Sequence, residues 1–195
     1  MTELHTLLRN IHACRVCAPH LPHVPRPVLQ ASGTARLCVV GQAPGLRVHK
    51  SGLSFNDRSG DRLREWMGID RNRFYDRSKI TIAAIAFCFS GYDVDGHDLP
   101  PRRECAEIWR TKLFDALPDF SLVLLVGRHA QSWHLGKAAK ETLHDTVRAW
   151  RDYAPRYIPL PHPSWRNSGW LNRNPWFKED LLPYLRGRVA AALSR

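Results

Sequence analysis

The chain has 195 residues, 44% of them hydrophobic, so it can bury one substantial core and has the usual size of one domain. Lysine and arginine outnumber aspartate and glutamate by 29 to 18, a formal net charge of +11, which favours a polyanionic partner such as DNA over a solvated basic surface without one. No stretch approaches the roughly 20 apolar residues that cross a bilayer, and the N-terminus lacks the apolar run of a signal peptide. We therefore expect a cytoplasmic monomer without membrane association, forming a single domain over residues 1–195.

The predicted elements begin with an amphipathic helix over Thr2 to Ala13, where leucine and isoleucine recur at helical spacing. Four prolines between Ala18 and Ser32 predict an extended strap instead of a helix. The last predicted helix has Asn174 as its N-cap and Pro175 at its first position. Between the strap and this helix, apolar runs predict buried strands at 36–41, 80–86, 122–126 and 157–160, and helical patterns fall at 61–67, 103–117 and, as two helices, 128–150.

Strands that alternate with helices predict an α/β protein. We expect a three-layer α/β/α sandwich around a central, mostly parallel, four-stranded sheet. Ligands of such sheets usually bind beyond the carboxyl ends of the strands. The loops after Gly41, Ala86, Gly127 and Leu160 are therefore expected on one rim, where a functional site would lie.

Four of the five cysteines are placed in a way that suits a metal site. Cys14 and Cys17 have a chelating spacing, whereas Cys88 follows a predicted strand and Cys105 lies in a predicted helix. Two local and two distant thiolates suit a tetrahedral site that attaches the N-terminal strap to the core. Zinc and an iron–sulfur cluster both use four thiolates, and four unrelated buried cysteines are the remaining alternative. Cys38 lies mid-strand and is predicted to be a small apolar core residue.

Five motifs, taken in chain order, carry a resemblance to a known family. They are the CxxC at 14–17, Val39-Val-Gly-Gln-Ala-Pro-Gly45, the segment Gly52-Leu-Ser-Phe-Asn-Asp-Arg-Ser-Gly-Asp61, the later pair of cysteines, and His162-Pro-Ser-Trp-Arg-Asn167. Each motif alone is weak, but their order and spacing together are specific. The chain resembles the iron–sulfur branch of the uracil-DNA glycosylase superfamily, usually called families 4 and 5.

The resemblance implies a cofactor and an activity. It implies a 4Fe–4S cluster, in preference to zinc, on Cys14, Cys17, Cys88 and Cys105, with residues 1–32 as the approximate cluster-binding segment. It also implies a repair enzyme that flips uracil out of DNA and hydrolyses its N-glycosidic bond, leaving an abasic site. We expect the cluster to be structural.

Hydrolysis of this bond builds positive charge on the sugar and negative charge on the departing base, so the site must stabilise both. By the resemblance, Phe55 is the surface on which the base stacks, with a plain core role as the alternative. Backbone groups at Gly41, Gln42 and Ala43 approach the base, because glycine and tight turns leave room. His162 is expected to donate a hydrogen bond to the base oxygen as its charge develops.

Asp57 is the candidate catalytic carboxylate, which steers water or shields the sugar cation, and a helix N-cap is its alternative role. The sequence departs from the family at Gln42 and Ala43, where family 4 and the best-known uracil enzymes respectively carry acids. The strand before Cys88 also lacks the asparagine that reads the uracil edge in family 4, and either Asn167 or Gln42 is expected to read that edge in its place. Because family 5 accepts deaminated purines as well, hypoxanthine and xanthine are further candidate bases.

DNA contacts are expected around the last motif. Trp165 and Arg166 lie where superfamily members insert side chains into the gap left by the flipped base. Ser51 and Ser164 are candidate phosphate contacts. Because the usual motif acids are missing, a catalytically weak or inactive iron–sulfur DNA-binding protein is the main alternative function. A small-molecule hydrolase would not need the surplus of positive charge.

Overall fold

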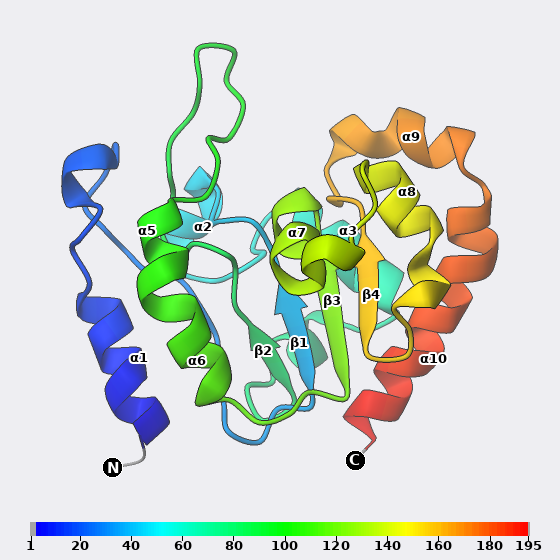
Figure 1. Cartoon of the computed structure of the whole chain (residues 1–195), viewed down its shortest axis with the longest axis horizontal. Coiled ribbons are helices and arrows are strands. Elements are labelled where there is room, and N and C mark those ends of the chain that lie inside the picture. The colour runs from blue at the N-terminus through cyan, green and yellow to red at the C-terminus, as the bar shows by residue number, and fades with distance from the viewer. Residues whose placement is uncertain (1–2, 195) are drawn as a thin grey trace.

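The computed structural model describes residues 3–194, and that part of the chain contains one four-stranded sheet (Figure 1). The strands lie in the order β2-β1-β3-β4, and every neighbouring pair runs parallel. Their bounds are β1 Leu37–Val40, β2 Ile80–Ile82, β3 Leu122–Val126 and β4 Tyr157–Leu160. The predicted α/β class is confirmed, and the sheet is parallel throughout.

Helices precede and follow the strands in the predicted alternation. The α-helices are α1 Glu3–Ala13, α2 Leu46–Ser51, α3 Arg58–Met67, α4 Arg71–Phe74, α5 Arg103–Cys105, α6 Thr111–Asp115, α7 Arg128–Leu135, α8 Leu143–Arg148, α9 Ser168–Arg173 and α10 Leu182–Leu193. A π-helical turn, Ala106–Arg110, joins α5 to α6 into one continuous helix. A second, Phe177–Leu181, leads into α10.

Side chains of β1 alternate between two cores, as a strand covered on both faces requires. Leu37 and Val39 pack with residues of α3 and α10 on one face. Cys38 and Val40 pack with residues of α1, α6 and α7 on the other. The layers therefore form the predicted α/β/α sandwich, and the core role predicted for Cys38 is confirmed because its side chain has no exposed surface.

The second strand is shorter than predicted. The apolar run 80–86 forms a strand only as far as Ile82. The physical reason is a buried guanidinium, because Arg110 donates hydrogen bonds to the carbonyls of Ala83 (3.2 Å) and Ala84 (2.7 Å) and so draws them out of a regular ladder. Apolar residues here signal burial and not strand geometry.

The start of the last helix also differs from the prediction. Asn174 precedes Pro175, as expected, but its side chain does not cap the helix backbone. Its amide instead donates to the Trp170 backbone carbonyl (2.8 Å) and accepts from the Trp176 indole (3.0 Å), which links the end of α9 to the Trp176 side chain. At the other end of the chain, helix α1 agrees with its prediction, except that Thr2 lies outside the described residues.

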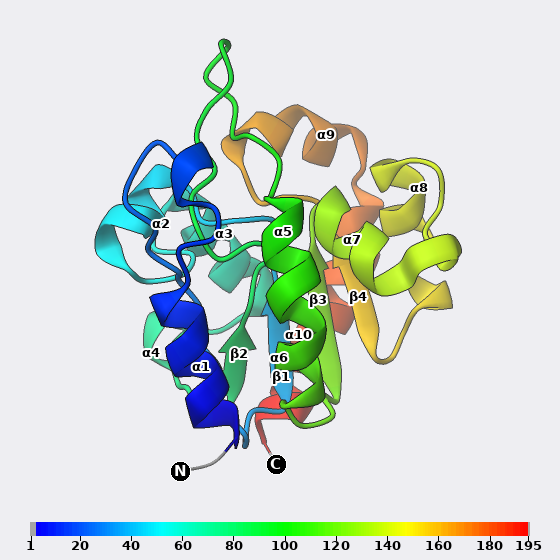
Figure 2. The ribbon, with the colours of Figure 1, turned by 60° about the vertical axis from the view of Figure 1, so that its left-hand side comes forward.

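The strands place one end of the molecule as the ligand-binding end. Their carboxyl ends point away from both chain termini, and the loop between β2 and α5 projects beyond this edge (Figure 1). Helix α1 lies beside the α5–α6 helix in front of the sheet (Figure 2). Among the described residues, no helix is both long enough and apolar enough to span a bilayer.

Candidate functional site

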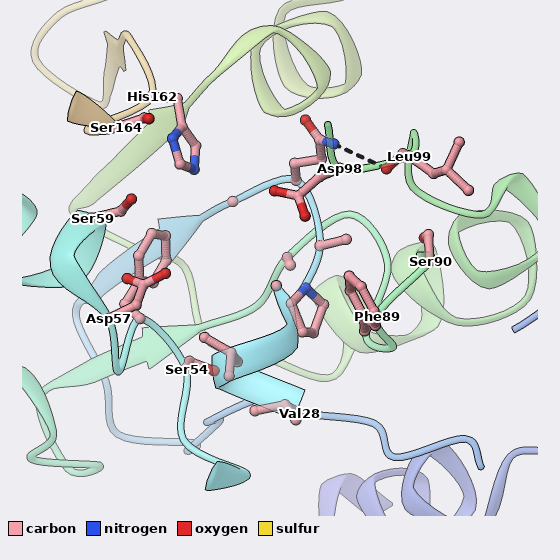
Figure 3. A pocket seen from close by; sticks show the side chains of 18 of the residues that line it. Val28, Ser54, Asp57, Ser59, Phe89, Ser90, Asp98, Leu99, His162 and Ser164 are labelled. Carbon is pink, nitrogen blue, oxygen red and sulfur yellow. Dashed lines mark hydrogen bonds between the residues drawn. The ribbon is translucent and has the colours of Figure 1, made fainter. Parts of the chain in front are cut away.

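A cavity of about 350 Å³ opens at the carboxyl edge of the sheet, in the size range of small-ligand sites (Figure 3). Loops after β1, β2 and β4 line it together with the start of α3. Ser51 and Trp165 do not line it, and the Ser51 hydroxyl donates to the Val48 carbonyl at the end of α2. The predicted site residues that line the cavity are Gly41, Gln42, Ala43, Phe55, Asp57, His162, Ser164, Arg166 and Asn167.

Phe55 lines the cavity with an unusual backbone. Its φ of 53° lies in the left-handed region, which is uncommon for a bulky residue. Arg64 donates to its carbonyl oxygen (3.2 Å), and a Cβ built on Gly60 would lie 1.7 Å from that oxygen, so only glycine fits there. The ring tip lies over Gly41, 3.1 Å from the place of an added Cβ, and meets the edge of Phe74. Phe55 is thus both a core contact and a cavity wall.

Asp57 combines the two roles considered for it. It is the N-cap of α3, where one carboxylate oxygen accepts a hydrogen bond from the Gly60 N–H (2.8 Å). The side chain also lines the cavity. Its position on the cavity wall is therefore fixed by the helix start.

His162 follows β4 and is partly buried, with Gly127 packed behind its Cβ. Burial lowers its pKa from the usual value, while the nearby carboxylates of Asp57 and Asp98 act in the opposite direction. The imidazole is therefore neutral at neutral pH and carries one N–H donor. The Asn167 amide donates to the His162 carbonyl (2.7 Å), so this amide group braces the histidine loop.

The loop that carries His162 is attached to α3. Arg62 donates to the carbonyl of Ser164 (2.9 Å) and to the hydroxyl of Ser168 (3.3 Å). The Ser164 hydroxyl accepts from the Arg166 N–H and so begins the short turn Trp165–Asn167. Trp165 is 69% exposed, with the Arg166 guanidinium 5.9 Å from its ring centroid. An exposed aromatic ring and a cation therefore stand together at the cavity rim.

Among the lining residues that sequence reasoning did not name is a second carboxylate, that of Asp98. It lies in the loop after β2, is solvent-exposed, and lines the cavity near the base of the projecting loop. Partial shielding from water raises its pKa, which His162 and Arg166 counteract. The Gln42 side chain donates a hydrogen bond to the carbonyl of Leu99, the residue that follows Asp98 (3.3 Å). The sequence signal that could have indicated Asp98 is its place in a loop that follows a predicted strand and so lies on the predicted rim.

A second pocket gathers the four cysteines considered as metal ligands. Cys14, Cys17, Cys88 and Cys105 all line it, among apolar side chains. The Trp109 indole donates to the Cys14 sulfur (3.2 Å). The segments far apart in sequence therefore meet as the spacing predicted, and the cysteines are not scattered through the core.

The other sulfurs also receive hydrogen bonds. The Phe87 N–H donates to Cys105 (3.4 Å), and the Arg26 backbone and Arg102 side chain donate to Cys88 and Cys17 respectively. Burial raises the pKa of Cys88 to about 11 and that of Cys105 to about 12. N–H donors aimed at sulfur stabilise thiolates that are bound to a metal. Without a bound metal, the thiols of Cys88 and Cys105 stay protonated at neutral pH.

The spacing of the sulfurs separates two kinds of metal centre. Among residues 3–194, one group of three or more His, Cys, Asp or Glu side chains has all its ligand atoms within 4.8 Å of one another. This group is Asp93, Asp95 and His97, on the exposed loop. No three of the four pocket sulfurs are therefore that close. Tetrahedral zinc with bonds of about 2.3 Å needs sulfurs about 3.8 Å apart. A centre larger than one zinc ion fits these residues better.

One family model matches the chain. It is described as the Uracil DNA glycosylase superfamily and covers residues 29–186. This range contains all four strands, every lining residue of the large cavity except Val28, and the cysteines Cys88 and Cys105. It begins after Cys14 and Cys17.

Proposed function

Because the chain belongs to the uracil-DNA glycosylase superfamily, whose members are typically DNA glycosylases, we propose that it hydrolyses the N-glycosidic bond of a deaminated base in DNA. The observation that carries the proposal is the meeting of Phe55, Asp57 and His162 around one cavity large enough for a flipped base. The product is an abasic site. The formal charge of +11 supports DNA as the partner, and we propose that one copy of the chain acts alone.

The flipped base enters the cavity against the Phe55 ring, beside the backbone after β1. Gly41 has no side chain, so the Phe55 ring lies close to the main chain there and the two form one wall. His162 donates its N–H to a carbonyl oxygen of the base, and this hydrogen bond strengthens as the base becomes an anion. A neutral imidazole suits this role, because it donates without first losing a proton to the base.

Asp57 stabilises the opposite charge. Its carboxylate is held by the Gly60 N–H at the start of α3, at a fixed place on the cavity wall. A fixed anion lowers the energy of the sugar cation that forms as the base departs. At the mouth of the cavity, Trp165 and Arg166 fill the gap in the duplex and contact its backbone, with Ser164 beside them.

The preferred base is uracil in this proposal, and hypoxanthine or xanthine is the alternative. The cavity supports the wider choice because Gln42 is tied to the Leu99 carbonyl and the Asn167 amide nitrogen to the His162 carbonyl. Each amide nitrogen thus has one of its two N–H groups engaged by the protein, which leaves fewer donors to read a pyrimidine edge. A site that grips the base through Phe55 and His162 discriminates less between deaminated bases.

We further propose that the four cysteines hold a 4Fe–4S cluster, which makes residues 1–32 the cluster-binding part of a single domain. The shared apolar pocket, the hydrogen-bond donors at all four sulfurs and sulfur spacing too wide for one zinc ion support this. When bound, the cluster supplies a structural crosslink between the strap and the core. Zinc remains the alternative occupant.

A DNA-binding protein without turnover is the second candidate function. It is favoured by Gln42 and Ala43, which stand where related enzymes carry the acid that activates water. Such a protein would keep the cavity, the cysteine pocket and the positive charge. It would recognise a flipped base without releasing it.

The deciding experiment uses anaerobically purified protein and end-labelled oligonucleotides containing uracil, hypoxanthine or xanthine, as single strands and as duplexes. Alkali after incubation cleaves abasic sites and reveals base release. His162→Ala and Asp57→Asn are compared with His5→Ala, which changes an exposed histidine of α1 far from the cavity. We expect the first two variants to lose about 10²-fold or more in rate and His5→Ala to match the parent. Binding without base release on every substrate would select the second candidate.

A further inference from the structure

The carboxylate of Asp98 is the unassigned chemical group of the cavity. Asp98 and His162 flank the same open space, and the loop that bears Asp98 comes from a different part of the chain (Figure 3). Within residues 3–194, no donor hydrogen-bonds the Asp98 carboxylate and no ion pair engages it. Both of its oxygens are therefore available to water or to a ligand in the cavity.

The loop holds Asp98 in place despite its exposure. Tyr92 and Asp98 form an antiparallel bridge at the base of the loop, and the Leu99 N–H donates to the Gly91 carbonyl (2.9 Å). Gln42 then fixes the Leu99 carbonyl through its side chain. The projecting loop is thus anchored at its base to the turn after β1, and the anchor is the residue next to Asp98.

This anchor places an acid beside the turn that lacks one. Positions 42 and 43 carry glutamine and alanine, so the turn after β1 offers no carboxylate of its own. Asp57 is the other acid of the cavity, and one of its oxygens is already held by the Gly60 N–H. Of the two carboxylates, Asp98 alone has both oxygens unengaged.

The charges around Asp98 suit a group that accepts a proton. His162 and Arg166 face it and favour its ionised form, whereas the Asp57 carboxylate and partial shielding from water raise its pKa. A carboxylate with a raised pKa is a stronger base than a free one, provided that it stays ionised at the working pH. DNA bound over the mouth would increase the shielding further.

We propose that Asp98 is the catalytic base, which takes a proton from the water that attacks the sugar. This inference rests on the proposed glycosylase function. The bond from C1′ to the base nitrogen breaks, and its electron pair leaves with the base, whose negative charge His162 stabilises. The water oxygen bonds to C1′ and its proton passes to Asp98, which later releases it to solvent. Asp57 remains the fixed anion beside the sugar.

The test measures single-turnover rates on the best substrate for the parent chain, Asp98→Asn, Asp98→Glu and Asp95→Asn. The last variant is the matched control, because Asp95 is an exposed acid of the same loop that does not line the cavity. We expect Asp98→Asn to lower the rate by about 10²-fold or more, Asp98→Glu to recover part of it, and Asp95→Asn to match the parent. Affinity for an uncleavable duplex should not weaken in any variant.

Two further readouts separate proton transfer from loop structure. The parent rate should fall as the pH falls through the raised pKa of Asp98, and Asp98→Asn should lose this acid limb. Added formate should raise the rate of Asp98→Ala, because a small carboxylate can occupy the vacated space. If the parent releases the base and Asp98→Asn releases it at the same rate, the role of Asp98 is overturned while the glycosylase function stands. A parent that releases no base from any substrate would overturn the glycosylase function and this role with it.

Discussion

The large cavity and the cysteine pocket are built in opposite ways. The cavity has polar and charged walls, an unpaired carboxylate and an open mouth. The cysteine pocket is apolar, and each of its four sulfurs already receives a hydrogen bond. A wall with free polar groups suits a molecule that enters, reacts and leaves. Sulfurs that N–H donors already hold in place suit a group that stays.

This contrast also separates what each region does for the fold. The cavity depends on local backbone devices, such as the left-handed Phe55 and the capped start of α3. The cysteine pocket joins distant segments, from the end of α1 to the helix that contains Cys105. Substitutions at the cavity should therefore lower activity more than stability. Substitutions in the cysteine pocket should lower stability first.

The largest expected effect comes from the cysteine pocket. Cys88→Ala removes one sulfur of the four and should lower both the bound iron and the free energy of unfolding, the latter by about 4 kcal/mol, the stabilisation given by a ligand at a thousand times its Kd. Iron analysis and urea unfolding measure the two. Cys38→Ala is the control, since Cys38 is a core residue and should keep the iron. Unchanged folding and DNA affinity in Cys88→Ala would remove the structural role.

Next comes the backbone at the cavity. Gly60→Ala places a Cβ against the Phe55 carbonyl, so the turn must move, at a cost of about 3 kcal/mol. Thermal unfolding and base release should both show the loss. Gly187→Ala is the matched change, because nothing lies within 4 Å of its added Cβ in α10, and it should stabilise the chain by up to about 1 kcal/mol. Equal behaviour of the two alanines would contradict the packing described for Phe55.

A smaller effect tests the contact between α7 and the helix from α5 to α6, which His134 and Arg110 make. Burial lowers the pKa of His134 to about 3, and its ring nitrogen lies 2.6 Å from the Arg110 guanidinium as an acceptor. Below pH 6.5 the unfolded chain binds a proton that the folded chain refuses, so stability falls with pH by at most about 1.4 kcal/mol per unit. His134→Gln keeps an acceptor without titrating. Its unfolding free energy should change less between pH 7 and pH 5, and an unchanged slope would refute the assignment.

The smallest effect concerns the rim. Arg166→Gln removes one exposed cation beside the cavity mouth without disturbing the Ser164 cap, which uses the backbone N–H. DNA affinity should fall less than tenfold, and the slope of log affinity against log salt should become shallower by about 0.9. Fluorescence anisotropy at several salt concentrations gives both values. Arg9→Gln on exposed α1 should leave the slope alone, and a shallower slope there instead would place the DNA elsewhere.

The sequence predicted the sheet because its signal is local. The apolar run 122–126 forms a buried strand over its whole length, and Asn174 before Pro175 marks a helix start even though its side chain binds two tryptophans. The end of β2 was not predictable, since it depends on Arg110, which lies 27 residues away from Ala83 in the chain. Long-range hydrogen bonds leave no periodic trace in sequence.

The site was predictable where a motif carries it. Gly41, Phe55, Asp57 and His162 come from motifs and do line one cavity. Asp98 belongs to no motif, and its place follows from a hydrogen bond between Gln42 and its neighbour. The left-handed backbone of Phe55 was equally unpredictable from the sequence, because phenylalanine rarely adopts this conformation.

The helix from α5 to α6 has a practical consequence for anyone who prepares this protein. It carries Cys105 in one pocket and, one turn further on, Arg110, whose guanidinium holds the Ala84 carbonyl on the wall of the other. A batch of protein with vacant cysteines would therefore also have a loosened cavity wall. With the iron–sulfur cluster that we propose, specific activity should accordingly be expressed per mole of bound iron, because total protein mass would mix competent and incompetent molecules.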